Sequence, residues 1–169
     1  MSKEIYIKVS KNGPYLVYGH PKMNEQHIIT DNEGVSIQYS DGEIYHIKEE
    51  PAALCRCGQS EHAPFCDGTH EYESWDGTEE ASFDEILRNA VPIEGPNYTL
   101  MDNESYCAFA RFCDADGQIW NLVTIGNEKT DERAVQEACD CPSGRLIMFK
   151  NGGDVIEPDL EKEISPLED

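Results

Sequence analysis

Three cysteines and a terminal histidine, His70, lie within the segment LCRCGQSEHAPFCDGTH, residues 54–70. Cys55 and Cys57 are separated by a single residue, and His70 follows Cys66 by four positions. A disulfide between the first two cysteines would be strained, because their spacing does not fit the bond's geometry. Thiolates and imidazoles bind both zinc and iron–sulfur clusters, so this set of three cysteines and a histidine suits either kind of metal centre.

The composition predicts a water-soluble chain in a reducing compartment. In 169 residues the formal net charge is −21, and hydrophobic residues make up 38%. No apolar run approaches the roughly 18 residues that a membrane helix requires, and the first residues, MSKEIYIKVSKNG, lack the apolar core of a signal peptide. We therefore expect a cytoplasmic protein with reduced thiols. Its acidity argues against nucleic-acid binding and could steer a basic redox partner.

The spacing of the first set matches a known signature. The unbroken string C-x-C-x2-S-x3-P-x-C-D-G-T-H resembles the CDGSH iron–sulfur domain, the module of mitoNEET-type proteins. The matching positions are Cys55, Cys57, Ser60, Pro64, Cys66, Asp67, Gly68, Thr69 and His70. The resemblance implies a 2Fe–2S cluster rather than zinc, with Cys55 and Cys57 on the inner iron and Cys66 and His70 on the outer iron.

A single histidine ligand has chemical consequences. A neutral imidazole in place of a thiolate removes one negative charge, so the reduction potential should lie above that of all-thiolate ferredoxins and toward the Rieske range. Imidazoles titrate near neutrality and protonation competes with iron binding, so we expect acid to loosen the cluster at His70. Gly68 permits the tight turn before this ligand, and Asp67 is expected to cap a short following helix.

Four further cysteines form a second set later in the chain: Cys107, Cys113, Cys139 and Cys141. The string from Cys107 to Cys113 can be aligned with the ferredoxin run C-x2-C-x2-C if Ala110 takes the place of the second cysteine. With Cys141-Pro142 as the later ligand, this half resembles the divergent mono-cluster ferredoxin domain. The matching hallmarks are Cys107, Cys113, Trp120 and the run Cys141-Pro142-Ser143-Gly144.

One ligand of that template is missing, so the sequence leaves the type of the second cluster open. Cys107, Cys113 and Cys141 would hold a 3Fe–4S cluster, whereas Cys139 as a fourth ligand would allow 4Fe–4S. A zinc site and four reduced structural cysteines are the alternatives. The aromatic residues of this half are expected to pack around the cluster and exclude water: Phe109, Phe112 and Trp120.

The pattern of the remaining sequence predicts an α+β fold, with a small antiparallel β-rich CDGSH domain followed by a small α+β ferredoxin-like domain. We expect strands at IYIKV, YLVYG, VSIQY and EIYHI, the last two joined by a hairpin turn at Asp41-Gly42. The segment SFDEILRNAV has capping-box spacing and predicts a short helix. A strand at IWNLVTI, a helix from Thr130 and a final strand at GRLIMFKNG should follow.

These elements predict four successive segments. They are residues 1–80, the β-rich CDGSH domain; residues 81–96, a helical connector; residues 97–153, the divergent mono-cluster ferredoxin-like domain; and residues 154–169, an acidic tail. The tail is proline-punctuated and poor in aromatic residues, so we expect a solvated arm.

We therefore expect a two-cluster electron-transfer protein that exchanges single electrons with redox partner proteins. The sequence has no glycine-rich nucleotide loop and no Ser/His/Asp arrangement, so we expect no enzymatic activity. The alternative is a cluster carrier, or a redox or pH sensor, that donates 2Fe–2S to apo-proteins through its His70 side. A third reading has both clusters only stabilising a partner oxidoreductase. The resemblance also implies a homodimer, although the long N-terminal β region could complete the fold within one chain.

Overall fold

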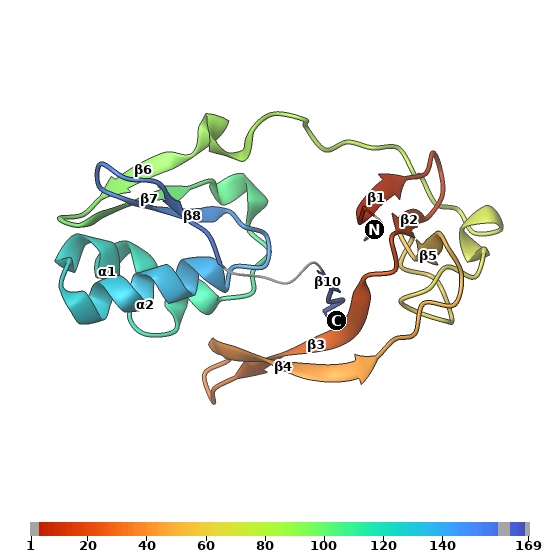
Figure 1. Ribbon diagram of the computed structural model, residues 1–169, viewed down its shortest axis with the longest axis horizontal. Coiled ribbons are helices and arrows are strands. Elements are labelled where there is room, and N and C mark those ends of the chain that lie inside the picture. Colours follow the sequence, from red (N-terminus) through yellow and green to blue (C-terminus); the bar gives the residue numbers. More distant parts are fainter. Residues whose placement is uncertain (1–3, 159–162, 168–169) are drawn as a thin grey trace. The chain divides into compact units, whose positions relative to one another are not determined.

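The computed structural model describes residues 4–158 and 163–167, which divide into two compact units (Figure 1). The first unit comprises the described parts of Met1–His27, Asp41–Ser82 and Glu161–Asp169, and the second comprises those of Ile28–Ser40 and Phe83–Leu160. Both units are discontinuous in sequence, because Ile28–Ser40 lies between two segments of the first unit but belongs to the second. No helix in the described ranges is both long and apolar enough to cross a membrane.

A three-stranded antiparallel sheet organises the first unit. Its strands are β1 (Tyr6–Val9), β2 (Tyr15–Tyr18) and β5 (Ala52–Leu54), in the order β1-β2-β5. A small core forms on this unit from Val17, Met23, Ala52 and Leu54, with Tyr45 and Phe65 packed against it. Because β5 ends at Leu54, this largely buried strand holds the start of the cysteine-containing loop in place.

The second pair of strands corrects one sequence prediction. β3 (Lys22–Thr30) and β4 (Ser36–Ile44) are neighbours, and Asp41-Gly42 lies within β4 rather than at a turn. The chain reverses earlier, where Asp31 Oδ1 accepts the backbone N–H groups of Glu33 at 2.8 Å and Val35 at 2.9 Å. Gly34 supplies the positive φ of 73° that this turn requires. The predicted hairpin turn was wrong because the chain has two aspartate–glycine turn signals, and the earlier one, Asp31 to Gly34, makes these hydrogen bonds.

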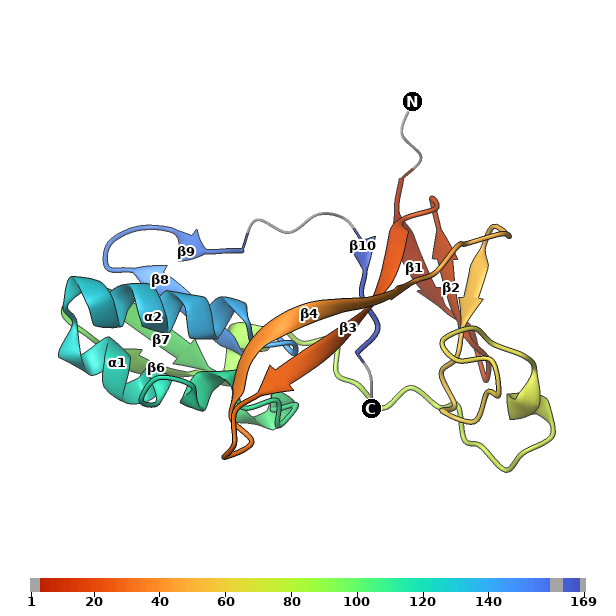
Figure 2. The ribbon, with the colours of Figure 1, turned by 90° about the horizontal axis from the view of Figure 1, so that it is seen from below.

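The second unit packs two helices on one face of a four-stranded antiparallel sheet (Figures 1 and 2). The strands are β6 (Val91–Glu94), β7 (Tyr98–Asp102), β8 (Leu146–Lys150) and β9 (Val155–Ile156), in that order, and the helices are α1 (Ile119–Ile125) and α2 (Glu128–Cys139). The buried core between these layers consists of Leu100, Ile119, Leu122, Val123, Ala134, Ala138, Leu146 and Met148. The predicted α+β class is confirmed. The strand predicted at GRLIMFKNG forms as β8, but it is not the last strand, because β9 follows it.

Helix α1 corrects the predicted strand at IWNLVTI. Ile119, Leu122 and Val123 are all buried, and their spacing places them on one helical face. The β-branched composition favoured a strand. Burial of this apolar face in the core overrides that local preference.

The predicted connector helix and the later helix had different outcomes. Within SFDEILRNAV only a 3-10 turn forms, Ile86–Asn89, and no side chain caps it. Helix α2 is confirmed, and it begins at Glu128 because Asn127 and Thr130 form a reciprocal capping box.

The end of the chain also departs from the expected solvated arm. Val155–Ile156 pairs antiparallel with β8, and β10 (Glu163–Ile164) pairs parallel with Lys22 and Met23 of β3. The half-buried apolar residues of both strands explain the pairing, so the prediction is wrong for these segments. Residues 159–162 and 168–169 of the predicted tail lie outside the described residues.

A buried carboxyl group on α2 should make the stability of the fold depend on pH. Glu137 is 1% exposed, and burial raises its pKa to about 7 although its Oε1 accepts the Asp116 N–H at 3.0 Å. The folded state therefore holds this proton more tightly than the unfolded state, and ionisation opposes folding.

We expect the free energy of unfolding to fall between about pH 4.5 and pH 7 through this group, by about 1–3 kcal/mol. Glu137→Gln should remove that component and stabilise the protein at pH 8, as measured by denaturant unfolding of the full chain. Glu132→Gln, on the exposed side of α2, is the matched control. An unchanged pH profile in Glu137→Gln would contradict the assignment.

Candidate metal centres

The first cysteine set lies in a loop whose two ends are hydrogen-bonded together. The Cys55 N–H donates to the Pro64 carbonyl at 2.7 Å, and the Cys66 N–H donates to the Ala53 carbonyl at 2.9 Å. Inside the loop, the Ser60 hydroxyl donates to the Phe65 carbonyl at 2.6 Å. These bonds bring Cys66 back beside the end of β5, where Cys55 begins the loop.

The four candidate ligands form two close pairs. Cys55 Sγ and Cys57 Sγ are 3.7 Å apart, and Cys66 Sγ and His70 Nδ1 are 3.5 Å apart. Two ligands of one tetrahedral metal, with sulfur about 2.3 Å and nitrogen about 2.0–2.1 Å from it, lie about 3.6–3.8 Å apart. Each pair therefore has the spacing of two ligands on one metal. Across the described ranges, no three or more His, Cys, Asp or Glu side chains form a group suited to a single ion.

Backbone amides stabilise negative charge at one end of this site. Burial opposes ionisation of Cys55, but the N–H groups of Ser60, Gly58 and Gln59 donate to its sulfur and the net pKa is lowered. At Cys57 the Gln59 amide also favours the thiolate, but burial and the neighbouring Cys55 outweigh it and raise the pKa. One thiolate thus forms readily, whereas the second needs a nearby positive charge, which a metal ion would supply.

The turn before His70 is held by Asp67. Its carboxylate accepts the Thr69 N–H at 3.0 Å and the Glu61 N–H at 2.9 Å, and hydrogen bonds from Thr69 and Glu61 keep the Asp67 pKa well below its usual range. Gly68, with φ of 88°, caps the 3-10 turn Thr69–Glu71, which has no side-chain cap. Asp67 therefore joins two parts of the loop instead of capping a helix as predicted.

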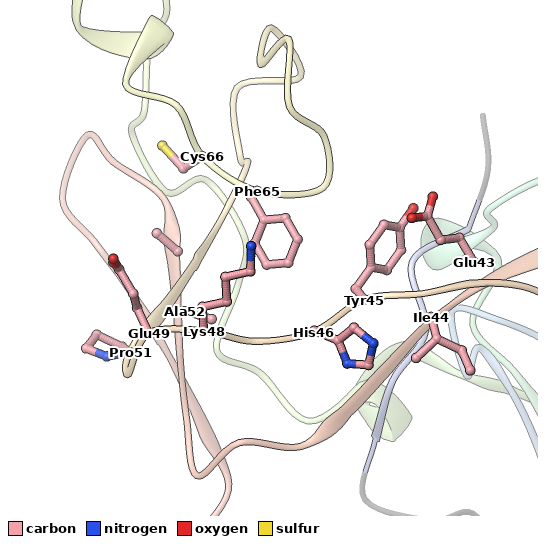
Figure 3. A pocket seen from close by; sticks show the side chains of 11 residues that line it. Glu43, Ile44, Tyr45, His46, Lys48, Glu49, Pro51, Ala52, Phe65 and Cys66 are labelled. Atoms are coloured by element: carbon pink, nitrogen blue, oxygen red, sulfur yellow. The ribbon is translucent and has the colours of Figure 1, made fainter.

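The histidine side of the site is half-buried and borders a pocket. The ring of His70 meets the ring of Trp75 edge-on, with centroids 5.9 Å apart, and Arg56 stacks over Trp75 at 5.3 Å. Sequence reasoning did not single out Trp75 or Arg56. Figure 3 shows the pocket, which Phe65 and Cys66 line from the ligand loop and Tyr45, His46 and Lys48 line from the preceding segment.

Three of the later four cysteines line one small cavity in the second unit. Cys107, Cys113 and Cys141 share this cavity with Ala110, the residue aligned with the missing ferredoxin ligand. Burial raises the pKa of Cys113. The positive charge of Arg145 opposes this shift, and the charges of Cys141 and Cys107 add to it. The three thiols are therefore close enough to influence one another.

Both halves of the chain match known domain families. Residues 12–71 match the family described as an iron-binding zinc finger of CDGSH type, and residues 93–151 match the family described as a divergent 4Fe-4S mono-cluster. The chain is a fusion of these two domain types. It therefore binds iron–sulfur cofactors, as the signatures predicted. No curated protein and no solved structure matched the chain.

In the mono-cluster domain, Cys139 lies apart from the shared cavity. It lines a neighbouring pocket with Cys141, Ile156 and Glu157. Burial raises the pKa of Cys139, followed by the charges of Asp140 and Glu157, with no contribution from another cysteine. Of the four predicted cysteines, the fold brings three together.

The mono-cluster domain also includes a segment that its family match does not cover. The tip of the β3–β4 hairpin, Ile28–Ser40, contacts both ligand-bearing loops. Ser36 Oγ donates to the Ala110 carbonyl, and Tyr39 Oη donates to the Asp140 carbonyl at 2.7 Å. The Tyr39 ring packs on Phe112 with centroids 4.5 Å apart, and burial beside Asp140 and Cys141 raises the pKa of Tyr39 to about 12.

The hairpin tip accepts two further hydrogen bonds from Arg111, in the loop between Cys107 and Cys113. Arg111 Nη1 donates to the carbonyls of Glu33 at 3.1 Å and Gly34 at 3.0 Å. Sequence reasoning missed this contact, because no local pattern relates residues 33–36 to residues 110–111. Phe109, in the same loop, is 85% exposed, so its predicted role in core packing was wrong, whereas Phe112 is buried.

A buried ion pair completes the mono-cluster site. Asp102 Oδ2 accepts hydrogen bonds from Arg145 Nη2 at 2.8 Å and from Trp120 Nε1 at 2.9 Å. Burial disfavours the charged guanidinium, but hydrogen bonds to Asp102 and Cys107, together with their charges, raise the pKa of Arg145. Trp120 thus packs on the core, as predicted, and also anchors this pair.

Proposed function

We propose that this chain is an electron-transfer protein that carries a 2Fe–2S cluster on Cys55, Cys57, Cys66 and His70 and a second cluster on Cys107, Cys113 and Cys141. The observation that carries the proposal is the division of the first ligand set into two pairs, 3.7 Å and 3.5 Å apart. A dinuclear cluster needs two protein ligands on each iron, whereas a structural zinc site needs four around one ion. A bound cluster would accept and release one electron at a time.

The chain's own residues would set the properties of the first site. The three amides that donate to Cys55 would stabilise the more negative, reduced state, and so would the neutral imidazole of His70. Both effects raise the reduction potential above that of an all-thiolate site.

For the second site we propose three cysteine ligands and a 3Fe–4S cluster. The shared cavity of Cys107, Cys113 and Cys141 and the separate position of Cys139 support this choice. A 4Fe–4S cluster would need a fourth ligand from Cys139 after rearrangement, or from outside the cysteine set.

We further propose that the chain acts without catalysis of its own, in a reducing compartment such as the cytoplasm, and passes electrons to partner proteins. None of the seven cysteines, all of which lie in the described residues, forms a disulfide, and this fits a reducing environment. The net charge of −21 suits a basic redox partner.

Iron and acid-labile sulfide analysis, combined with EPR of the oxidised and dithionite-reduced protein, tests the proposal. We expect two separate signals and about five irons per chain, or about six if the second cluster is 4Fe–4S. Cys57→Ser should abolish only the 2Fe–2S signal and Cys113→Ser only the other, while Cys139→Ser leaves both. Colourless protein that contains zinc and no iron would overturn the proposal.

A cluster carrier is the second candidate, because Cys66 lines the open pocket of Figure 3 and neither outer ligand is fully buried. Incubating the loaded protein with an apo-ferredoxin separates the two functions. Transfer of the cluster faster than electron exchange favours the carrier, and reversible reduction without transfer favours the electron-transfer protein.

A further inference from the structure

The mono-cluster domain buries a positive charge beside its cysteines. Arg145 is only 7% exposed and lines the same small cavity as Cys107, Cys113 and Cys141. A guanidinium cannot lose its proton at ordinary pH, so the cavity wall carries a permanent charge. Burying such a charge is costly unless it is paired or meets an acceptor.

The guanidinium is held by groups from two neighbouring elements. Asp102 on β7 accepts from Nη2, and the ring of Trp120 lies 5.9 Å from the guanidinium carbon. The adjacent strands bring these residues together, since Asp102 pairs with Leu146, the residue after Arg145. The bond to Asp102 therefore holds the guanidinium in the wall of the cavity that Cys107 also lines.

One hydrogen-bond donor of Arg145 has no acceptor in the described residues. Its Nε is buried and has no partner within residues 4–158 and 163–167, and neither has Asp102 Oδ1. Orphaned buried donors are rare in folded proteins. Arg145 lines the three-cysteine cavity, so the sulfur atoms of a cluster bound there would supply the acceptor that this donor lacks.

We infer that Arg145 is a positioning residue that raises the reduction potential of the second cluster through its fixed positive charge in the wall of the three-cysteine cavity. The inference rests on the proposed function, because it presumes a reducible cluster on these cysteines. Reduction adds one electron from the donor and breaks no bond to the protein, so the site becomes one charge more negative. A buried cation that lines the same cavity as the ligand cysteines favours that change, because charges interact strongly away from water. The negative charge of Asp102, whose Oδ2 lies 2.8 Å from Arg145 Nη2, opposes it.

Redox titration of the full, cluster-loaded chain, followed by EPR with dithionite as reductant, tests the inference. Arg145→Met should make reduction of the second cluster at least tenfold less favourable, a downward shift of at least 59 mV for one electron. Arg145→Lys, which keeps the charge, should recover part of this shift. Arg88→Gln removes an exposed arginine of the same unit and is the control, and the 2Fe–2S potential should be unchanged in every variant.

Asp102→Asn provides a test of opposite sign that keeps Arg145 in the chain. It removes the opposing negative charge, so the potential of the second cluster should rise, which a purely structural role would not cause. This variant decides the question if Arg145→Met fails to assemble the cluster. An unchanged potential in an assembled Arg145→Met, equal shifts in Arg145→Met and Arg145→Lys, or an unchanged or lower potential in Asp102→Asn would each overturn the inference. A wild-type chain without a reducible second cluster would instead overturn the proposed function.

Discussion

His70→Cys is expected to lower the reduction potential of the 2Fe–2S cluster by on the order of 100–300 mV and to make the cluster resistant to acid. The variant replaces a neutral ligand by a thiolate, so the reduced state carries one more negative charge. Cys66 and His70 form a pair with Nδ1 3.5 Å from the sulfur, so a cysteine at position 70 can reach the same iron. An imidazole binds iron only when it is unprotonated, so the wild-type cluster should be lost as the pH falls below neutrality.

Visible absorbance of the cluster between pH 8 and pH 5, together with an EPR-monitored redox titration, measures both effects. His62→Gln is the matched control, because His62 lies in the same loop and its side chain is 76% exposed. We expect the control to lose its cluster at the same pH as the wild type. Equal acid sensitivity in His70→Cys and the wild type would show that another group governs release.

Tyr39→Ala is expected to remove the second cluster while leaving the 2Fe–2S cluster in place. The substitution deletes the ring that packs on Phe112 and the hydroxyl that bonds the Asp140 carbonyl, next to Cys141. Tyr39 thereby contacts both segments that carry the ligands, one beside Cys113 and one beside Cys141. Its loss should lower the free energy of unfolding of the second unit by about 2–4 kcal/mol. Tyr39→Phe, which loses only the hydrogen bond, should cost about 1 kcal/mol and retain most of the cluster.

The measurement is the ratio of the two EPR signals in the purified full chain, with thermal unfolding recorded in parallel. Ile37→Ala is the control on the same strand, since Ile37 is 45% exposed. Both clusters at wild-type levels in Tyr39→Ala would mean that the hairpin tip is not needed to hold the second site.

The local sequence was sufficient for the first site because all its ligands lie within one short loop. The spacing of Cys55, Cys57, Cys66 and His70 leaves few ways to close that loop, and Asp67 and Gly68 specify the turn by hydrogen bonding and a positive φ. Helix α2 was also predictable, since its capping box lies within four consecutive residues. In contrast, the turn at Asp31–Gly34 formed because it competed successfully with the second turn signal at Asp41-Gly42. Ile119–Ile125 is helical because its apolar face is buried in the core.

The sequence by itself determined that the chain carries two iron–sulfur domain types and which cysteines and histidine are candidate ligands, because the side-chain chemistry and the spacing of ligands are local properties. Only the tertiary structure decided that Cys139 is separate from the other three cysteines, that the hairpin tip Ile28–Ser40 supports the second site, and that Arg145 and Asp102 form a buried pair beside Cys107. These relations join residues far apart in the chain. They arise from strand pairing and core burial, whose energies depend on the whole fold rather than on any short stretch of sequence.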